Sequence, residues 1–129
     1  MGIFDVFKKK EPLIPDEKLN KLWDAWVAGK VPAPWAALMT YESEVNNGGH
    51  DQYFFNVNET GDVQAEVKTV LSLLPEVLKS NLQRAWEAYQ ASPDAEDEND
   101  DLFNECDDVF YANEKPLIDL IQNYANDLY

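Results

Sequence analysis

The spacing of the apolar residues is the feature of this sequence that most narrows its possible folds. Leucine, valine and aromatic side chains recur every three or four positions along most of the chain, which is the period of one face of an α-helix. No stretch shows a convincing strand pattern, in which apolar and polar residues alternate. The sequence therefore predicts an all-α fold, a single compact domain of about six to seven helices.

Capping and turn residues divide this pattern into separate helices. We expect a first helix from Asp16, as its N-cap, to Ala28, and a second helix that begins near Trp35. The second helix ends in the turn of residues 46–49, which contains two glycines. Further helices are expected at residues 51–56, 62–74, 75–89, 102–110 and 116–128, with residues 94–101 as a charged connector.

Length and composition fit one domain. A chain of 129 residues that is 45% hydrophobic can bury one core, so we assign residues 16–129 to the domain and residues 1–15 to an N-terminal leader. Cys106 is the only cysteine and His50 the only histidine, which excludes an internal disulfide and favours a cytoplasmic protein. No apolar run approaches the roughly 18 residues of a membrane span.

The negative charge is concentrated toward the C-terminus. The formal net charge is −15, and residues 94–129 hold twelve acids against one base, whereas residues 1–30 hold five acids against six bases. A field of this sign repels nucleic acid and membrane headgroups and attracts basic molecules. We therefore expect a basic protein as the partner, with no direct binding of nucleic acid or membrane; the oligomeric state is left open.

The acids that follow residue 93 are the candidates for partner contacts. Asp101, Glu105 and Asp108 share one helical face, at successive turns of about 5.4 Å. Like charges at this spacing cost a few tenths of a kcal/mol per pair, and an ordinary solvated face mixes its signs. The alternative is a solvated face that serves solubility alone. The predicted contacts are Asp94, Asp97, Glu98, Asp101, Glu105 and Asp108.

Residues 41–56 form the most distinctive stretch. A helical wheel places Glu42 among apolar residues, and a buried carboxylate needs donors, of which Gln52 and the amides of the following turn are the nearest. His50 is expected to be a polar surface or cap residue. We interpret the stretch as scaffold that locks two helices together; a small-ligand or enzymatic site at residues 46–52 is the alternative. The scaffold residues are Glu42, Asn46, Asn47, Gly48, Gly49, Gln52 and Asn56.

Neither a catalytic site nor a cofactor or metal site is expected. No nucleophile stands at a recognisable spacing from an acid–base group, and Cys106 belongs to a core-facing stripe. Asp97 and Asp101 occupy the first and fifth positions of a calcium-binding loop, but Leu102 stands where such a loop needs glycine. The sequence therefore predicts a binding protein that is not an enzyme.

Two motifs carry a resemblance to a known family. The motif E-x-E-V-N-N-G-G-x-x-Q-Y-F-x-N at residues 42–56 and the downstream motif D-D-x-F-Y at residues 107–111 resemble the bacterial DNA-mimic-protein-like domains over residues 19–129. The family often has an aromatic residue where this chain has His50. The resemblance implies a helical domain whose surface carboxylates replace DNA phosphates on a DNA-binding protein, such as a transcriptional regulator. An immunity-type protein that neutralises a basic toxin is the alternative.

Overall fold

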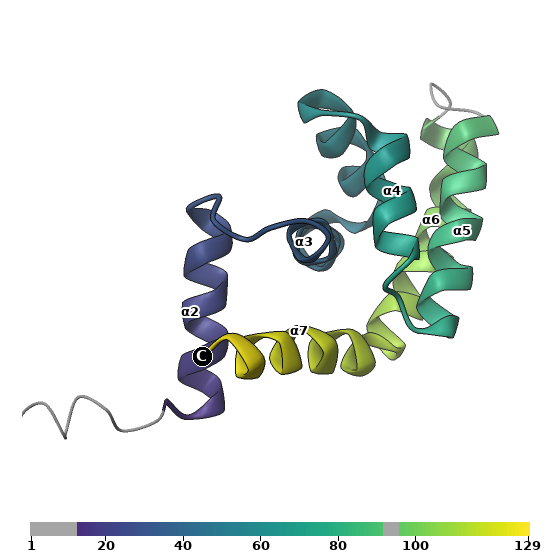
Figure 1. The fold of residues 1–129 in the computed structure, drawn as a ribbon. Helices are drawn as coiled ribbons and strands as arrows, with labels where there is room; N and C mark the ends of the chain where they lie inside the picture. Colours follow the sequence, from purple (N-terminus) through teal and green to yellow (C-terminus); the bar gives the residue numbers. More distant parts are fainter. Residues whose placement is uncertain (1–12, 92–95) are drawn as a thin grey trace, which may run out of the picture.

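Six helices make up the part of the chain that the structure describes. Figure 1 shows this computed structural model, which describes residues 13–91 and 96–129. The described residues contain no strand, so the prediction of a single all-α domain is confirmed. None of these helices is both long and apolar enough to cross a membrane. The helices are α2 (Pro15–Val27), α3 (Trp35–Thr60), α4 (Val63–Leu71), α5 (Glu76–Ala91), α6 (Glu96–Ala112) and α7 (Glu114–Leu128).

The helices pack as two pairs that α3 joins. Helix α2 packs against α7, and α5 packs against α6, with α4 on α3 and α5. Figure 1 shows α2 and α6 on opposite sides of the molecule, with α7 running between them. Helix α3 contacts α4, α6 and α7, so it connects both sides.

Aromatic and aliphatic side chains from all of these elements fill one core. Two contacts between helices help to fix this core. Trp35 of α3 stacks on Tyr124 of α7, with ring centroids 4.3 Å apart. Buried Asn81 of α5 donates a 2.7 Å hydrogen bond to the Cys106 carbonyl of α6. The bond from Asn81 satisfies a polar group that would otherwise destabilise the core. The fully buried aromatic side chains are Tyr41, Tyr53, Phe54 and Phe110.

Two helix starts differ from the predictions. Helix α2 begins at Pro15 with Ile14 as its N-cap, so the prediction of Asp16 as N-cap is wrong: a proline suits the first helical position because its φ is preset. Helix α6 begins at Glu96, within the predicted connector. Acidic residues are favoured in the first turn of a helix in general, because the N-terminal end of the helix dipole is positive.

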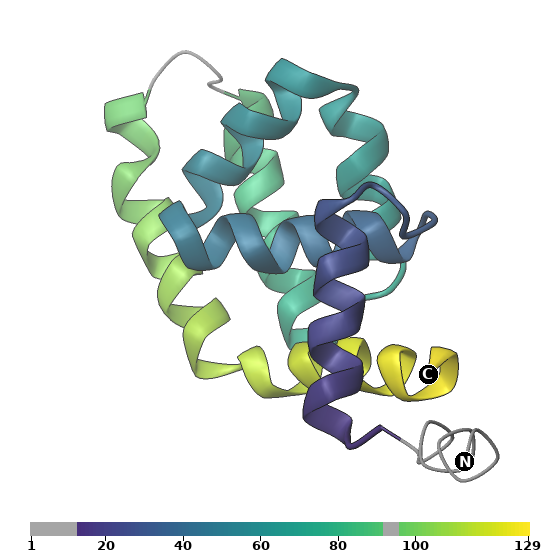
Figure 2. The ribbon, with the colours of Figure 1, turned by 90° about the vertical axis from the view of Figure 1, so that its left-hand side faces the viewer.

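Helix α3 is broken at the predicted double glycine. Gly48 (φ −158°, ψ 15°) and Gly49 (φ 81°, ψ −178°) are not helical, and Figure 2 shows that the two halves of α3 run in different directions. The second half continues to Thr60, beyond the predicted end at Asn56, because buried Val57 extends its apolar face. The break places residues 50–60 between α4 and α6.

Candidate partner-binding site

The outward face of α6 carries exposed carboxylates at successive turns. Phe103, Cys106 and Phe110 turn one side of α6 into the core, so Asp101 and Asp108 on the other side project away from it. These two acids are seven positions apart, a rise of about 10 Å along the helix. Residues 97 and 98 lie in the first turn of α6, and residue 94 lies outside the described residues. The stretch that resembles a calcium-binding loop is therefore continuous helix.

Glu105, between these two acids, has a counter-ion within the protein. The Arg84 Nη2 atom of α5 lies 2.7 Å from Glu105 Oε2, and both side chains are more than half exposed. An exposed pair of this kind stabilises a fold by about 0–1 kcal/mol at most. Asp101 and Asp108 take part in no ion pair with any side chain that the structure describes. Of the three acids on this face of α6, Asp101 and Asp108 are the ones left available to a basic partner.

A second row of carboxylates lies where α6 faces α3. Asp100 and Asp107 are two turns apart on α6, and Asp51 begins the second half of α3. Burial raises the pKa of Asp51, and the nearby Asp100 and Asp107 carboxylates raise it further. Asp51 and Asp100 were not among the predicted partner contacts, because these were chosen from one face of α6 and its preceding segment, and the sequence does not show that α3 brings Asp51 beside Asp100. We call Asp51, Asp100, Asp101, Glu105 and Asp108 the acidic surface.

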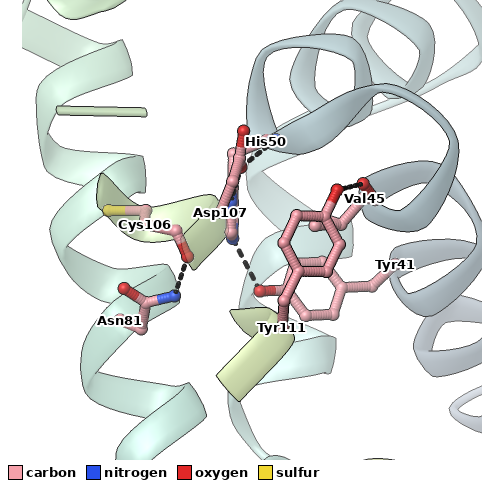
Figure 3. A network of polar contacts seen from close by, with 7 residues as sticks. All are labelled: Tyr41, Val45, His50, Asn81, Cys106, Asp107 and Tyr111. Atoms are coloured by element: carbon pink, nitrogen blue, oxygen red, sulfur yellow. Dashed lines mark hydrogen bonds and ion pairs between the residues drawn. The ribbon is translucent and has the colours of Figure 1, made fainter. Parts of the chain in front are cut away.

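His50 is fully buried beside this second row (Figure 3). Asp107 Oδ1 accepts hydrogen bonds from the His50 backbone N–H at 2.9 Å and from Nδ1–H at 2.7 Å. With Nδ1 as the donor to Asp107, Nε2 accepts a hydrogen bond from the Tyr41 hydroxyl, with Nε2 and Oη 2.7 Å apart. The prediction that His50 is a polar surface or cap residue is wrong, because Asp107, a partner 57 residues away in sequence, lets the ring be buried.

The double glycine allows Asp107 to approach this closely. Gly49 has a φ of 81°, in the left-handed region that favours glycine. A Cβ atom at Gly49 would lie 2.4 Å from Asp107 Oδ2, and one at Gly48 would overlap the Gln52 side chain. Figure 3 also shows the Tyr111 hydroxyl donating to the Val45 carbonyl at 3.1 Å. These contacts tie α6 to the break in α3 and so hold both rows of acids in register.

Gln52 and Asn56 belong to another part of the motif. Glu44 Oε2 accepts hydrogen bonds from Asn56 Nδ2 at 2.6 Å and from Gln52 Nε2 at 3.1 Å. Gln52, one of the nearest donors expected for Glu42, therefore binds Glu44 instead. The helical wheel could not decide between the two, because the direction that Gln52 takes depends on the backbone of the break.

Glu42 is only half-buried and faces a groove rather than the core. Asn46 Nδ2 donates to Glu42 Oε1 at 2.7 Å and also to Glu114 Oε2. Burial and the adjacent Glu114 raise the pKa of Glu42 to about 7. Gln52 lines a different hollow, so the two side chains do not share a pocket. The groove is lined by Trp23, Glu42, Ser43, Asn46, Asn47, Glu114 and Ile118.

Comparison with known families identifies the group to which these features belong. A family model described as DMP19-like protein, the family of DNA mimic protein 19, matches residues 32–128. The chain belongs to the DMP19-like family. The matched region contains helices α3–α7, and with them the break, the buried histidine and the acidic surface, so the resemblance seen in the motifs is confirmed. Neither the curated proteins nor the solved structures give a match.

Proposed function

We propose that this DMP19-like chain binds a basic DNA-binding protein through its acidic surface, in the place of DNA. The observation that carries the proposal is the pair of exposed carboxylates, Asp101 and Asp108, that project from α6 without a counter-ion among the described side chains. Membership of a family of DNA mimics supports this assignment. Contacts of the partner with Asp94, Asp97 and Glu98 remain a prediction from the sequence, because the side chains of these residues lie outside the described part of the chain.

The two rows of acids supply charge on more than one line. Asp101 and Asp108 face outward, and Asp51 and Asp100 flank them on the side of α3. The phosphates of duplex DNA are spread over a face, so a DNA-binding surface contacts negative groups on more than one line. One helix alone would present carboxylates along a single line. Lys and Arg side chains of the partner would pair with these carboxylates, which speeds encounter and makes binding weaken with salt.

The proposal assigns binding and no chemical step to the chain. His50 and Asp107 resemble an acid–base pair, but the group on the other side of the imidazole is the Tyr41 hydroxyl, and Tyr41 and His50 are both fully buried. An acid–base group must reach the proton that it transfers in a bound substrate. The network therefore supports a role in holding α6 against α3.

Affinity capture tests the proposal. The full chain, immobilised, should retain a basic DNA-binding protein from a native lysate, and excess duplex DNA should release it. The variant Asp101→Asn/Asp108→Asn should lose the captured protein. The control Asp24→Asn/Asp127→Asn makes the same change in charge at α2 and the end of α7, away from α6 (Figure 1), and should keep it. Capture that DNA does not reverse, or that both variants retain equally, would contradict the proposal.

A further inference from the structure

We propose that the groove between α2, α3 and α7 holds one cationic side chain of the basic partner, arginine or lysine, with its charged end between Glu42 and Glu114. This inference rests on the proposed function, since it names a second place where the same partner would be held. Three features favour this occupant: the way the two carboxylates are fixed, the walls of the groove and its position next to the acidic surface.

The two carboxylates are held together by one amide group. Asn46 Nδ2 donates to Glu42 Oε1 at 2.7 Å, to the Glu42 carbonyl at 3.0 Å and to Glu114 Oε2. Two carboxylates this close repel each other, and burial adds to the cost of charging Glu42. Its pKa of about 7 reflects both effects. A cation between the two groups would remove the repulsion and displace the proton that Glu42 retains near neutral pH.

No base within the described part of the chain serves as that cation. Neither Glu42 nor Glu114 takes part in an ion pair among those residues. Lys115, the next residue along the chain from Glu114, turns instead to Asp119, with Nζ and Oδ2 2.8 Å apart. Among the residues that the structure describes, the pair is therefore left without a balancing charge.

The remaining walls of the groove suit the stem of a long cationic side chain. Trp23 of α2 and Ile118 of α7 supply apolar surface, and Ser43 and Asn47 of α3 supply polar groups. The groove has a volume of about 590 Å³, within the range of sites that hold small ligands. Arginine and lysine bury their aliphatic stems along such walls while the charged end meets carboxylates, and an aromatic ring attracts the cation further.

The groove continues the acidic surface. Asn47 lines both the groove and the adjacent hollow that Asp51 of the acidic surface lines. The charges of Asp107, Glu114 and Asp108 also raise the pKa of Tyr111, after the larger effect of burial. A partner that covers the acidic surface at Asp51 therefore lies next to the groove. This continuity favours a basic protein over a free small molecule as the source of the cation.

Nuclear magnetic resonance of the isotopically labelled full chain tests the inference with a defined probe. N-acetyl-arginine amide should shift the Trp23 indole N–H and the Asn46 side-chain NH₂ resonances, whereas the neutral isostere N-acetyl-citrulline amide should not. The Glu42 carboxyl resonance should titrate at lower pH when the arginine probe is bound. Glu42→Gln and Glu114→Gln should each weaken binding about tenfold, the loss of one charge-assisted hydrogen bond.

The variant Asp101→Asn/Asp108→Asn provides the matched control and should bind the arginine probe at this groove as the wild type does. Absence of the shifts, equal shifts with citrulline, or unchanged affinity in both glutamine variants would each overturn the inference. The probe experiment uses no partner protein, so the two experiments can fail separately. If the probe does not bind, the capture result is unaffected. If capture fails, the probe experiment can still show whether the groove binds arginine.

Discussion

Tyr41 and Tyr53 are equally buried, but their hydroxyl groups have different surroundings. The Tyr41 hydroxyl bonds to His50, whereas the Tyr53 hydroxyl has no hydrogen-bond partner among the described groups. Tyr41→Phe leaves the His50 Nε2 atom buried and unpaired and should lower the free energy of unfolding by about 1–3 kcal/mol. Tyr53→Phe removes a buried hydroxyl that forms no hydrogen bond among the described groups, so the free energy of unfolding should stay the same or rise. Urea denaturation of both variants checks this; equal losses would contradict it.

Glu42 should make the stability of the fold depend on pH. Its pKa is raised from 4.5 to about 7, so the folded state binds the proton more tightly than the unfolded state. The contribution of Glu42 to stability is then fully present below pH 4.5 and is lost as the pH rises to about 7. Glu42→Gln should be more stable than the wild type at pH 8 and similar to it near pH 4.5. Urea denaturation of both proteins at pH 4.5 and pH 8 measures the difference in their free energies of unfolding. A difference that does not change with pH would contradict the raised pKa of Glu42.

At the scale of one element, the break in α3 depends on Gly49 for two reasons. Gly29 and Gly49 both have positive φ, of 72° and 81°, but a Cβ at Gly29 meets nothing within 4 Å, whereas one at Gly49 meets the Asp107 carboxylate. Gly29→Ala should cost about 1–2 kcal/mol of stability from backbone strain alone. Gly49→Ala should cost at least twice as much, because Asp107 must also move. Thermal denaturation compares the two, and equal losses would show that the contact with Asp107 contributes nothing.

The sequence predicts local features of the helices and fails where a contact joins distant segments. The position of the break in α3 was predictable because two glycines follow a helical pattern, and the cap at Asp62 was predictable because its carboxylate accepts a bond from the Ala65 amide three residues later. The burial of His50 was not, because Asp107 lies 57 residues away. The start of α6 at Glu96 was not predictable, because a run of acids fits a charged connector as well as the first turn of a helix, where negative side chains are favoured.

At the scale of the whole molecule, the acids are concentrated on one of the two sides that α3 joins, because the sequence of α6 holds eight acids and no base. Arg84 of α5 pairs with one of them, Glu105. Arg84→Gln releases Glu105 from its ion pair, so association with a basic partner should become a few-fold faster at low salt and more sensitive to salt. The free energy of unfolding should change by no more than about 1 kcal/mol, because the pair is exposed. Stopped-flow association rates over a range of salt concentrations measure this. A slower rate would show that Glu105 is not in contact with the partner.

If the chain binds its partner in the place of DNA, the chain and duplex DNA should compete for one surface of that partner. The most direct measurement is fluorescence anisotropy of labelled duplex DNA bound to the captured partner, titrated with the unlabelled chain. The anisotropy should fall to the value of free DNA, and the Asp101→Asn/Asp108→Asn variant should need a much higher concentration than the Asp24→Asn/Asp127→Asn control. Anisotropy that stays high or rises as the chain binds would reveal a complex that contains the DNA as well, and would contradict mimicry of DNA.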